Sequence, residues 1–205
     1  MFIDFTDEQK ALREELREYY ANLITPEIHE LQKQEEGTGP VRRKLVEQLG
    51  EDGWIAMGWP EEYGGQGKSA IEQFIFYDET MRVGSPAPML TINTVGPTIM
   101  EYGTDEQKEH FLPKIAAGKL HFCIGYSEPD AGTDLASLTT RAVRDGDEYV
   151  INGQKTWTSL ALGCDYIWLA ARTDPDVPKH KGISLFAIPI DTPGITIEPL
   201  SLLST

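Results

Sequence analysis

Polar side chains that could contact a ligand are concentrated in one short stretch, GYSEPDAGTD at residues 125–134. The stretch holds the carboxylates of Glu128, Asp130 and Asp134 but neither a lysine nor an arginine. In a structural interpretation, its proline and glycine turn the chain at the end of a strand, while the carboxylates cap backbone amides or face solvent.

In a functional interpretation, the same stretch binds a ligand. Ser127 and Thr133 offer hydroxyls, and a glycine between them leaves the backbone open to a flat molecule at the edge of a sheet. A second polar and aromatic cluster, WTS, follows at residues 157–159. A single tryptophan on a strand usually belongs to a core, but two such clusters separated by one hairpin favour a shared site.

The hairpin is predicted from EYVINGQKTWTS. Asn152-Gly153 supplies two residues that adopt positive φ readily, as a type I′ turn requires. The strand that leaves this turn is expected to carry Trp157 and Ser159 on one face.

Other chemistry-bearing residues form no recognisable site. The histidines are far apart in the sequence and lack partners at metal-ligand spacing, so no metal site is predicted. The sequence contains no GxSxG elbow, so it gives no support to a hydrolase. Cys123 and Cys164 show no CxxC spacing and are predicted to be buried free thiols. The four histidines are His29, His110, His121 and His180.

Composition narrows the class of partner. The 205 residues carry a formal net charge of -15, which argues against nucleic acid and anionic membranes because both require clustered cations. No stretch approaches the ~20 apolar residues of a membrane span, and the start, MFIDFTDEQ, lacks the features of a signal peptide. We expect a cytoplasmic protein without membrane insertion, although a mature mitochondrial matrix enzyme would have the same features.

The spacing of hydrophobic residues along the sequence changes near Gly118, from a helical period to the alternation typical of strands. Before it, capping boxes at Thr6 and Thr104 and apolar spacings of three and four predict helices. One of them, from about Ser69, carries Ile71, Phe74, Ile75, Asp78 and Met81. After it, short alternating runs predict an antiparallel barrel or sandwich. The fold class is therefore α+β, with an all-α domain at 1–118 followed by a β domain at 119–205.

GITIEPL, which is predicted to be a strand, is followed only by SLLST. An open apolar edge invites association, so we expect a missing remainder or a partner chain.

The sequence resembles the flavin-dependent acyl-CoA dehydrogenases over nearly its whole length. The likeness runs through CIGYSEPDAGTDLASLTTRAVRDGDEYVINGQKTWTS and continues through DYIWLAARTD and GISLFAIPIDTPGITIEPL. The helical half adds GWIAMGWPEEYGGQG and YGTDEQKEHFLPKIAAGK. Helices followed by a β domain, with these segments in this order, are more specific than any one short motif.

The resemblance implies an FAD site on two segments. Hydroxyls and amides at Ser127 and Ser159 would hydrogen-bond the polar edge of the isoalloxazine, and Trp157 would pack against its apolar part. Thr133 matches the position that meets the pantetheine arm of the acyl-CoA. Two departures from the family pattern are Tyr126, where a small or apolar residue is usual, and Ser159, where threonine is usual. The implied FAD contacts are Ile124, Tyr126, Ser127, Trp157, Thr158 and Ser159.

The resemblance also implies a reaction, α,β-desaturation of an acyl-CoA thioester. In the family a glutamate on a C-terminal helical bundle removes the Cα proton while hydride passes from Cβ to flavin N5. That bundle is absent from these 205 residues, so no catalytic residue is assigned, and we expect the chain alone to hold FAD weakly and form no enoyl-CoA. Electron-transfer flavoprotein is the implied acceptor, and a homo- or hetero-oligomer the implied assembly.

Two alternatives stay open. One is a non-catalytic FAD-binding or scaffold subunit that pairs with a complete dehydrogenase. The other is a family relative that uses the flavin to activate oxygen.

Overall fold

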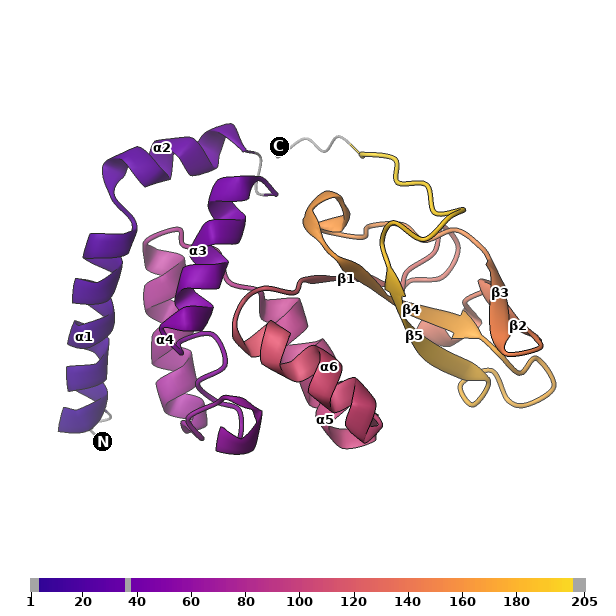
Figure 1. Ribbon diagram of the computed structural model, residues 1–205, viewed down its shortest axis with the longest axis horizontal. Helices are drawn as coiled ribbons and strands as arrows, with labels where there is room; N and C mark the ends of the chain where they lie inside the picture. The colour runs from indigo at the N-terminus through magenta and orange to yellow at the C-terminus, as the bar shows by residue number, and fades with distance from the viewer. Residues whose placement is uncertain (1–3, 36–37, 201–205) are drawn as a thin grey trace. The chain divides into compact units, whose positions relative to one another are not determined.

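The computed structural model describes residues 4–35 and 38–200. These residues form two compact units, the first ending at Leu120 and the second beginning at His121 (Figure 1). The first unit is helical, and the second is built on a five-stranded sheet. The α+β class expected from the change of hydrophobic period is therefore confirmed.

One helix of the helical unit has neither of the predicted capping boxes at its start. This helix is α2, whose start at Thr25-Pro26 combines a side-chain cap with a proline in the first turn. A π-helical turn, η2, leads directly into α5, whose first turn contains Pro97. Proline is tolerated there because the first turn needs no amide donor. The elements are α1 (Asp7–Leu23), α2 (Pro26–Gln34), α3 (Pro40–Glu51), η1 (Glu61–Tyr63), α4 (Ala70–Arg82), η2 (Thr91–Val95), α5 (Gly96–Tyr102) and α6 (Asp105–Ala116).

Capping chemistry fixes where three of these helices begin. Both predicted capping boxes, at Thr6 and Thr104, are present, and Ser69 forms a third with Glu72. In each box a hydroxyl accepts from the third helical amide, while that residue's side chain accepts from the backbone N–H of the capping residue.

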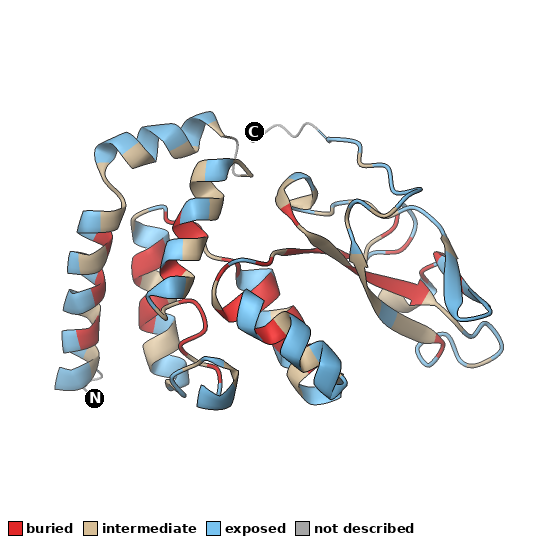
Figure 2. Cartoon of the chain, in the orientation of Figure 1, coloured by how far each residue is buried: buried red, intermediate tan, exposed pale blue. Residues whose placement is uncertain are grey.

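The face that α4 buries agrees only in part with the predicted one. Ile75 is buried as predicted, but Ile71, Phe74 and Met81 are exposed, whereas Glu79 and Thr80 are buried. The buried side of α1 faces α4 (Figure 2), and its contacts there include polar ones. Polar groups thus take buried positions where hydrophobic periodicity anticipated apolar ones, because partners on α1 satisfy them.

Two of the polar contacts between α1 and α4 involve the buried side chains of Thr80 and Glu79. The hydroxyls of Tyr20 and Thr80 lie 2.6 Å apart. The Glu79 side chain, 2% exposed, accepts from Arg17 at 3.2 Å and pairs with Arg13 at 3.2 Å. Two arginines from one helix therefore neutralise one buried carboxylate of the other.

The second unit holds strands β1 (Phe122–Gly125), β2 (Arg141–Asp145), β3 (Glu148–Asn152), β4 (Tyr166–Arg172) and β5 (Ile183–Pro189). The prediction of a purely antiparallel sheet is wrong, because β4 runs parallel to both β1 and β2. Among the strands of the described residues, the β2–β3 and β4–β5 pairs are antiparallel. The parallel pairs join segments far apart in the sequence, which the local strand pattern could not reveal.

The predicted hairpin turn is also wrong. β2 and β3 are joined by Gly146-Asp147, with Gly146 at φ 62, and Asn152 ends β3 instead of turning it. No strand forms at residues 154–159 or at 194–200, so the WTS segment and GITIEPL are not strands. The face predicted for Trp157 and Ser159 therefore cannot be taken from strand register.

The two cysteines meet in the second unit. Cys123 and Cys164 are buried and free, as predicted, and their Sγ atoms lie 3.0 Å apart. Their hydrogen bond and burial raise the pKa of the Cys123 thiol.

The α1–α4 contact gives a stability prediction. Glu79→Gln should lower the free energy of unfolding by about 1–3 kcal/mol, because it removes the buried charge that pairs with both Arg13 and Arg17. Each arginine keeps a second carboxylate partner, Asp78 or Glu14, and solvent around both keeps the cost in this range. Chemical denaturation measures it. Glu14→Gln removes the same charge from an exposed pair with Arg17 and should cost about 0.5 kcal/mol or less. Equal losses for the two variants would contradict the assignment.

Candidate functional site

The acidic stretch lies where one edge of β4 changes partner. β1 pairs with β4 up to Leu169, and β2 joins the same edge at Arg172, since β5 occupies the other edge along the whole strand. The segment 126–140 leaves the sheet at this gap and must return to it.

A small core holds that segment in place. Leu138 and Ala131 are buried against Ala170 of β4, and Tyr126 packs against the same cluster. Burial raises the pKa of the Tyr126 phenol. The ring of Tyr126, one of the two departures from the family pattern, contributes to this cluster.

Glu128 is the polar centre of the segment. Its carboxylate accepts from the Thr139 amide and hydroxyl at 2.7 Å each, from the Thr140 amide at 2.8 Å and from Lys155 Nζ at 2.9 Å. Burial opposes its ionisation, but the hydrogen bonds from Thr140, Thr139 and Lys155 outweigh burial and hold the pKa of Glu128 well below its ordinary value of 4.5.

Lys155 links the two clusters that the sequence singled out. Its Nζ also donates to the Tyr126 carbonyl at 3.0 Å, and the Thr156 amide donates to the Ser127 carbonyl at 2.9 Å. The segments at 126–128 and 155–156 therefore lie side by side, which brings Ser127 close in the structure to the WTS segment.

The WTS segment has an uncommon backbone. Trp157 has φ 60 and Leu160 φ 66, and these are the non-glycine residues at positive φ in the described ranges. A bulky residue in the left-handed region costs about 1–3 kcal/mol and persists only where its surroundings hold it. The Trp157 side chain is nevertheless 65% exposed, so burial does not compensate for this strain.

Hydroxyls in the two segments are available to a ligand. Across residues 4–35 and 38–200, the structure gives no hydrogen-bond partner to the side chains of Ser127, Thr133, Thr158 or Ser159. The nearby hydroxyl of Thr139 is engaged by Glu128. Free hydroxyls beside an exposed indole fit a flat, partly polar ring such as an isoalloxazine.

Thr133 and Ile124 belong to other parts of the secondary structure than Ser127 and the WTS segment. Thr133 is exposed on the loop after β1, next to Asp134, which pairs with Lys179 and accepts from Ser137. Ile124 is half-buried within β1, opposite Trp168.

The sequence interpretation placed these carboxylates at backbone amides or in solvent. Glu128 caps backbone amides, as predicted, but also pairs with Lys155, and Asp134 pairs with Lys179. Lys155 was not among the residues predicted for the site, although its position two residues before Trp157 is the sequence signal that points to it.

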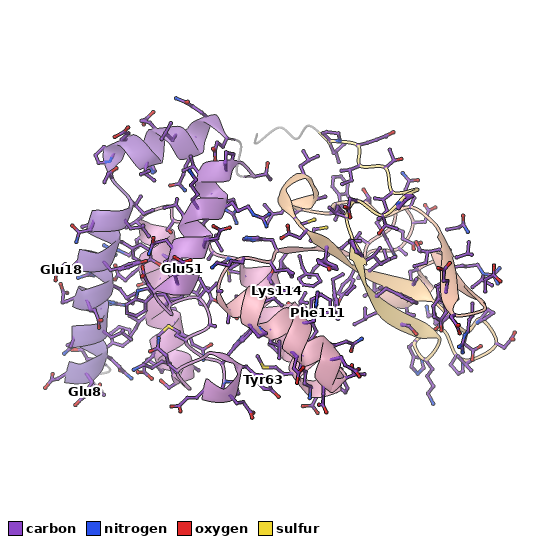
Figure 3. The ribbon with its side chains drawn as sticks, viewed as in Figure 1. Glu8, Glu18, Glu51, Tyr63, Phe111 and Lys114 are labelled. Atoms are coloured by element: carbon purple, nitrogen blue, oxygen red, sulfur yellow. The ribbon has the colours of Figure 1, made fainter. Side chains whose placement is uncertain are left out.

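The helical unit has a separate cavity of ≈ 580 Å³, in whose wall are Glu51 of α3 and Tyr63 of η1 (Figure 3). No residue of the predicted FAD or substrate site lines it. The lining residues are Gly50, Glu51, Glu62, Tyr63, Gly64, Lys108, Glu109, Leu112, Pro113, Ala116 and Ala117.

None of the helices within the described ranges combines the length and apolar character that a membrane crossing requires.

Family models match both units. The model of the acyl-CoA dehydrogenase N-terminal domain matches residues 6–119, and that of the middle domain matches residues 123–203. The chain belongs to the acyl-CoA dehydrogenase family. The resemblance found in the sequence is thereby confirmed.

Several relatives match this chain over about half of their own length. Acyl-CoA dehydrogenase FadE26 of Mycobacterium tuberculosis is 57% identical over 206 residues, covering 98% of this chain and 52% of that protein. The ChsE4-ChsE5 complex from Mycobacterium tuberculosis superposes with TM-score 0.93 at 57% identity, over 100% of this chain and 52% of that one. The chain spans about half the length of the curated relatives it matches.

Two further solved structures extend the comparison. The Tcur3481-Tcur3483 steroid ACAD has TM-score 0.93 and 52% identity, covering 100% of this chain and 53% of that one. A glutaryl-CoA dehydrogenase from Mycobacterium smegmatis, solved in complex with FADH2, has TM-score 0.77 and 27% identity, covering 96% and 49%.

The environment of Glu128 gives a pH prediction. A carboxyl whose pKa is lowered on folding stabilises the protein above its ordinary pKa of 4.5 and loses that contribution as pH falls toward the folded value. The difference in unfolding free energy between the wild type and Glu128→Gln should therefore be constant near neutral pH and shrink below about pH 4.5. Denaturant titrations from neutral to acid pH measure it.

Glu148→Gln, on exposed β3, controls for loss of one negative charge. A difference between wild type and Glu128→Gln that stays constant into acid would contradict the prediction.

Proposed function

We propose that this chain supplies the N-terminal and middle domains of a FAD-dependent acyl-CoA dehydrogenase that desaturates an acyl-CoA thioester at the α,β position. The carrying observation is that Lys155 and Thr156 bind the backbone at 126–127, beside an exposed Trp157 and uncommitted hydroxyls. Family membership supplies the reaction class.

FAD, when bound, supplies a two-electron hydride acceptor. The chain's own contribution is to hold and orient the ring: Ser127, Thr158 and Ser159 offer hydrogen bonds to its polar edge, and Trp157 offers an apolar surface. Ile124 and Tyr126 flank these contacts on the first segment. Thr133 is proposed to meet the pantetheine arm of the substrate. The base is assigned to the C-terminal bundle of the family and not to a carboxylate here, because Glu128 is saturated by four donor contacts.

Assembly with a second, different chain is part of the proposal. The structures at 57% and 52% identity are a ChsE4-ChsE5 complex and a Tcur3481-Tcur3483 steroid ACAD, each named for two proteins. The second of these names also favours a steroid-bearing acyl-CoA as the first substrate class to test. The same observation supports the second candidate, in which this chain holds FAD while its partner carries the base. Electron-transfer flavoprotein as acceptor and a cytoplasmic location remain predictions.

Anaerobic titration of the assembled flavoprotein tests the function. Straight-chain, branched and steroid-bearing acyl-CoA thioesters are added in turn while the visible flavin band is followed. Bleaching by one class, with the matching enoyl-CoA as product, is the expected result. A protein that binds FAD but is bleached by none of them, or whose reduced flavin turns over oxygen rapidly, would contradict the proposal.

A substitution at Trp157 can distinguish an effect on FAD binding from an effect on the stability of the protein. Trp157→Gly should weaken FAD binding and shift the flavin spectrum, because the indole surface is gone. The FAD-free protein should be no less stable, and up to about 1 kcal/mol more stable, since glycine adopts positive φ without strain. FAD titration and thermal unfolding measure the two effects, with Tyr102→Ala, an exposed aromatic of the helical unit, as control. Unchanged FAD affinity would assign Trp157 no role at the ring.

A substitution at Thr133 tests whether this residue contacts the substrate or the cofactor. Thr133→Val keeps the shape and removes the hydroxyl, so acyl-CoA affinity should fall by about 0.5–1.5 kcal/mol while FAD stays bound. Equilibrium titration with a non-reacting acyl-CoA analogue measures the change, and Thr196→Val, also on an exposed loop, is the matched control. Loss of FAD with unaltered acyl-CoA binding would show that Thr133 had been assigned to the wrong ligand.

A further inference from the structure

Two segments far apart in the sequence meet around one buried ion pair. The side chains of Glu128 and Lys155 are 5% and 8% exposed, and their charged atoms lie 2.9 Å apart. Glu128 sits one residue after Ser127, and Lys155 two residues before Trp157. Each member of the pair is therefore placed almost next to a residue proposed to contact the flavin.

The pair is tied to the backbone on both sides. Glu128 accepts from the amides of Thr139 and Thr140, which anchors it to the return of the loop toward β2. Its own amide and carbonyl bond Ala131 at 2.7 and 3.2 Å, closing the turn between them. Lys155 donates to the Tyr126 carbonyl as well as to Glu128. Movement of either charged group would therefore displace the backbone that bears the candidate contacts.

The strained backbone needs such an anchor. Trp157 and Leu160 adopt positive φ, while residues 153–159 belong to no strand and so lack the regular bonds of a ladder. The bonds made by Lys155 and by the Thr156 amide immediately precede this strained turn. A cost of about 1–3 kcal/mol per strained residue requires fixed neighbours to maintain it.

We propose that Glu128 and Lys155 are positioning residues for the flavin: their ion pair sets the distance between the Ser127 segment and the Trp157 segment, and so shapes the surface that receives the isoalloxazine. The proposal rests on the FAD site proposed above. Neither side chain has to touch the cofactor, because both act through the backbone they hold.

The first arm of the experiment measures FAD affinity in the assembled protein, stripped of flavin and titrated with FAD. Lys155→Met keeps most of the buried stem and removes the charge. Glu128→Gln keeps the shape and removes the charge; its one remaining oxygen can accept from either the Thr139 or the Thr140 amide, which bond different oxygens of Glu128. Each should bind FAD about 10–100-fold more weakly, which is the loss typical when groups that orient the direct contacts of a bound group are removed. The double variant should be no weaker than the worse single variant, because both remove one interaction.

The second arm uses a property that lost stability alone does not change. At saturating FAD, the visible absorption and circular dichroism of the bound flavin should shift in Lys155→Met and Glu128→Gln. Lys179→Met is the matched control, since it breaks an exposed lysine–carboxylate pair with Asp134 in the same unit. It should leave both affinity and spectrum unchanged.

The outcomes separate the two proposals. If the wild-type protein binds no FAD, the proposed function fails. If the wild type binds FAD and the variants bind it with the same affinity and spectrum, even with lower melting temperatures, the pair is only structural and the positioning role is overturned. If Lys155→Met does not fold, the isosteric Glu128→Gln alone decides between these outcomes.

Discussion

The shared edge of β4 is the constraint on which the second unit depends. Two parallel neighbours, β1 and β2, occupy that edge one after the other, so the chain between them must leave the sheet and come back. Its return buries Glu128 over the sheet. A buried carboxylate needs donors and a compensating charge, and Lys155 supplies the charge from a segment distant in the sequence. The approach of the two candidate cofactor segments follows from this electrostatic requirement.

The second unit also combines rigidity with strain in adjacent residues. Lys155 and Thr156 are held by buried or backbone hydrogen bonds. The next residue, Trp157, adopts a disfavoured conformation with its indole largely in solvent. Such an arrangement reduces the stability of the free protein and is consistent with a surface shaped for a ligand. The helical unit also has a buried carboxylate, Glu79, which joins two helices. Unlike Glu128, Glu79 lies next to no residue of the candidate site.

Local chemistry in the sequence predicted much of the helical unit. The capping boxes at Thr6 and Thr104 involve residues three apart, so their interactions are visible in a short window. The face of α4 was only partly predicted, because its burial depends on arginines of α1 that no periodicity on α4 encodes. The sheet was predicted as a set of strands, but its parallel pairing and the true hairpin at Gly146-Asp147 depend on long-range contacts. For the same reason the candidate segments were identifiable by residue type, while the link through Lys155 was not.

A structure of the flavin-loaded protein tests the central claim most directly. The account predicts an isoalloxazine stacked or edged against Trp157, with at least one hydroxyl among Ser127, Thr158 and Ser159 within hydrogen-bonding distance of its polar edge. It also predicts that Lys155 Nζ still bridges Glu128 and the Tyr126 carbonyl beneath the ring. A flavin bound elsewhere, with Trp157 and these hydroxyls still in solvent, would contradict the account.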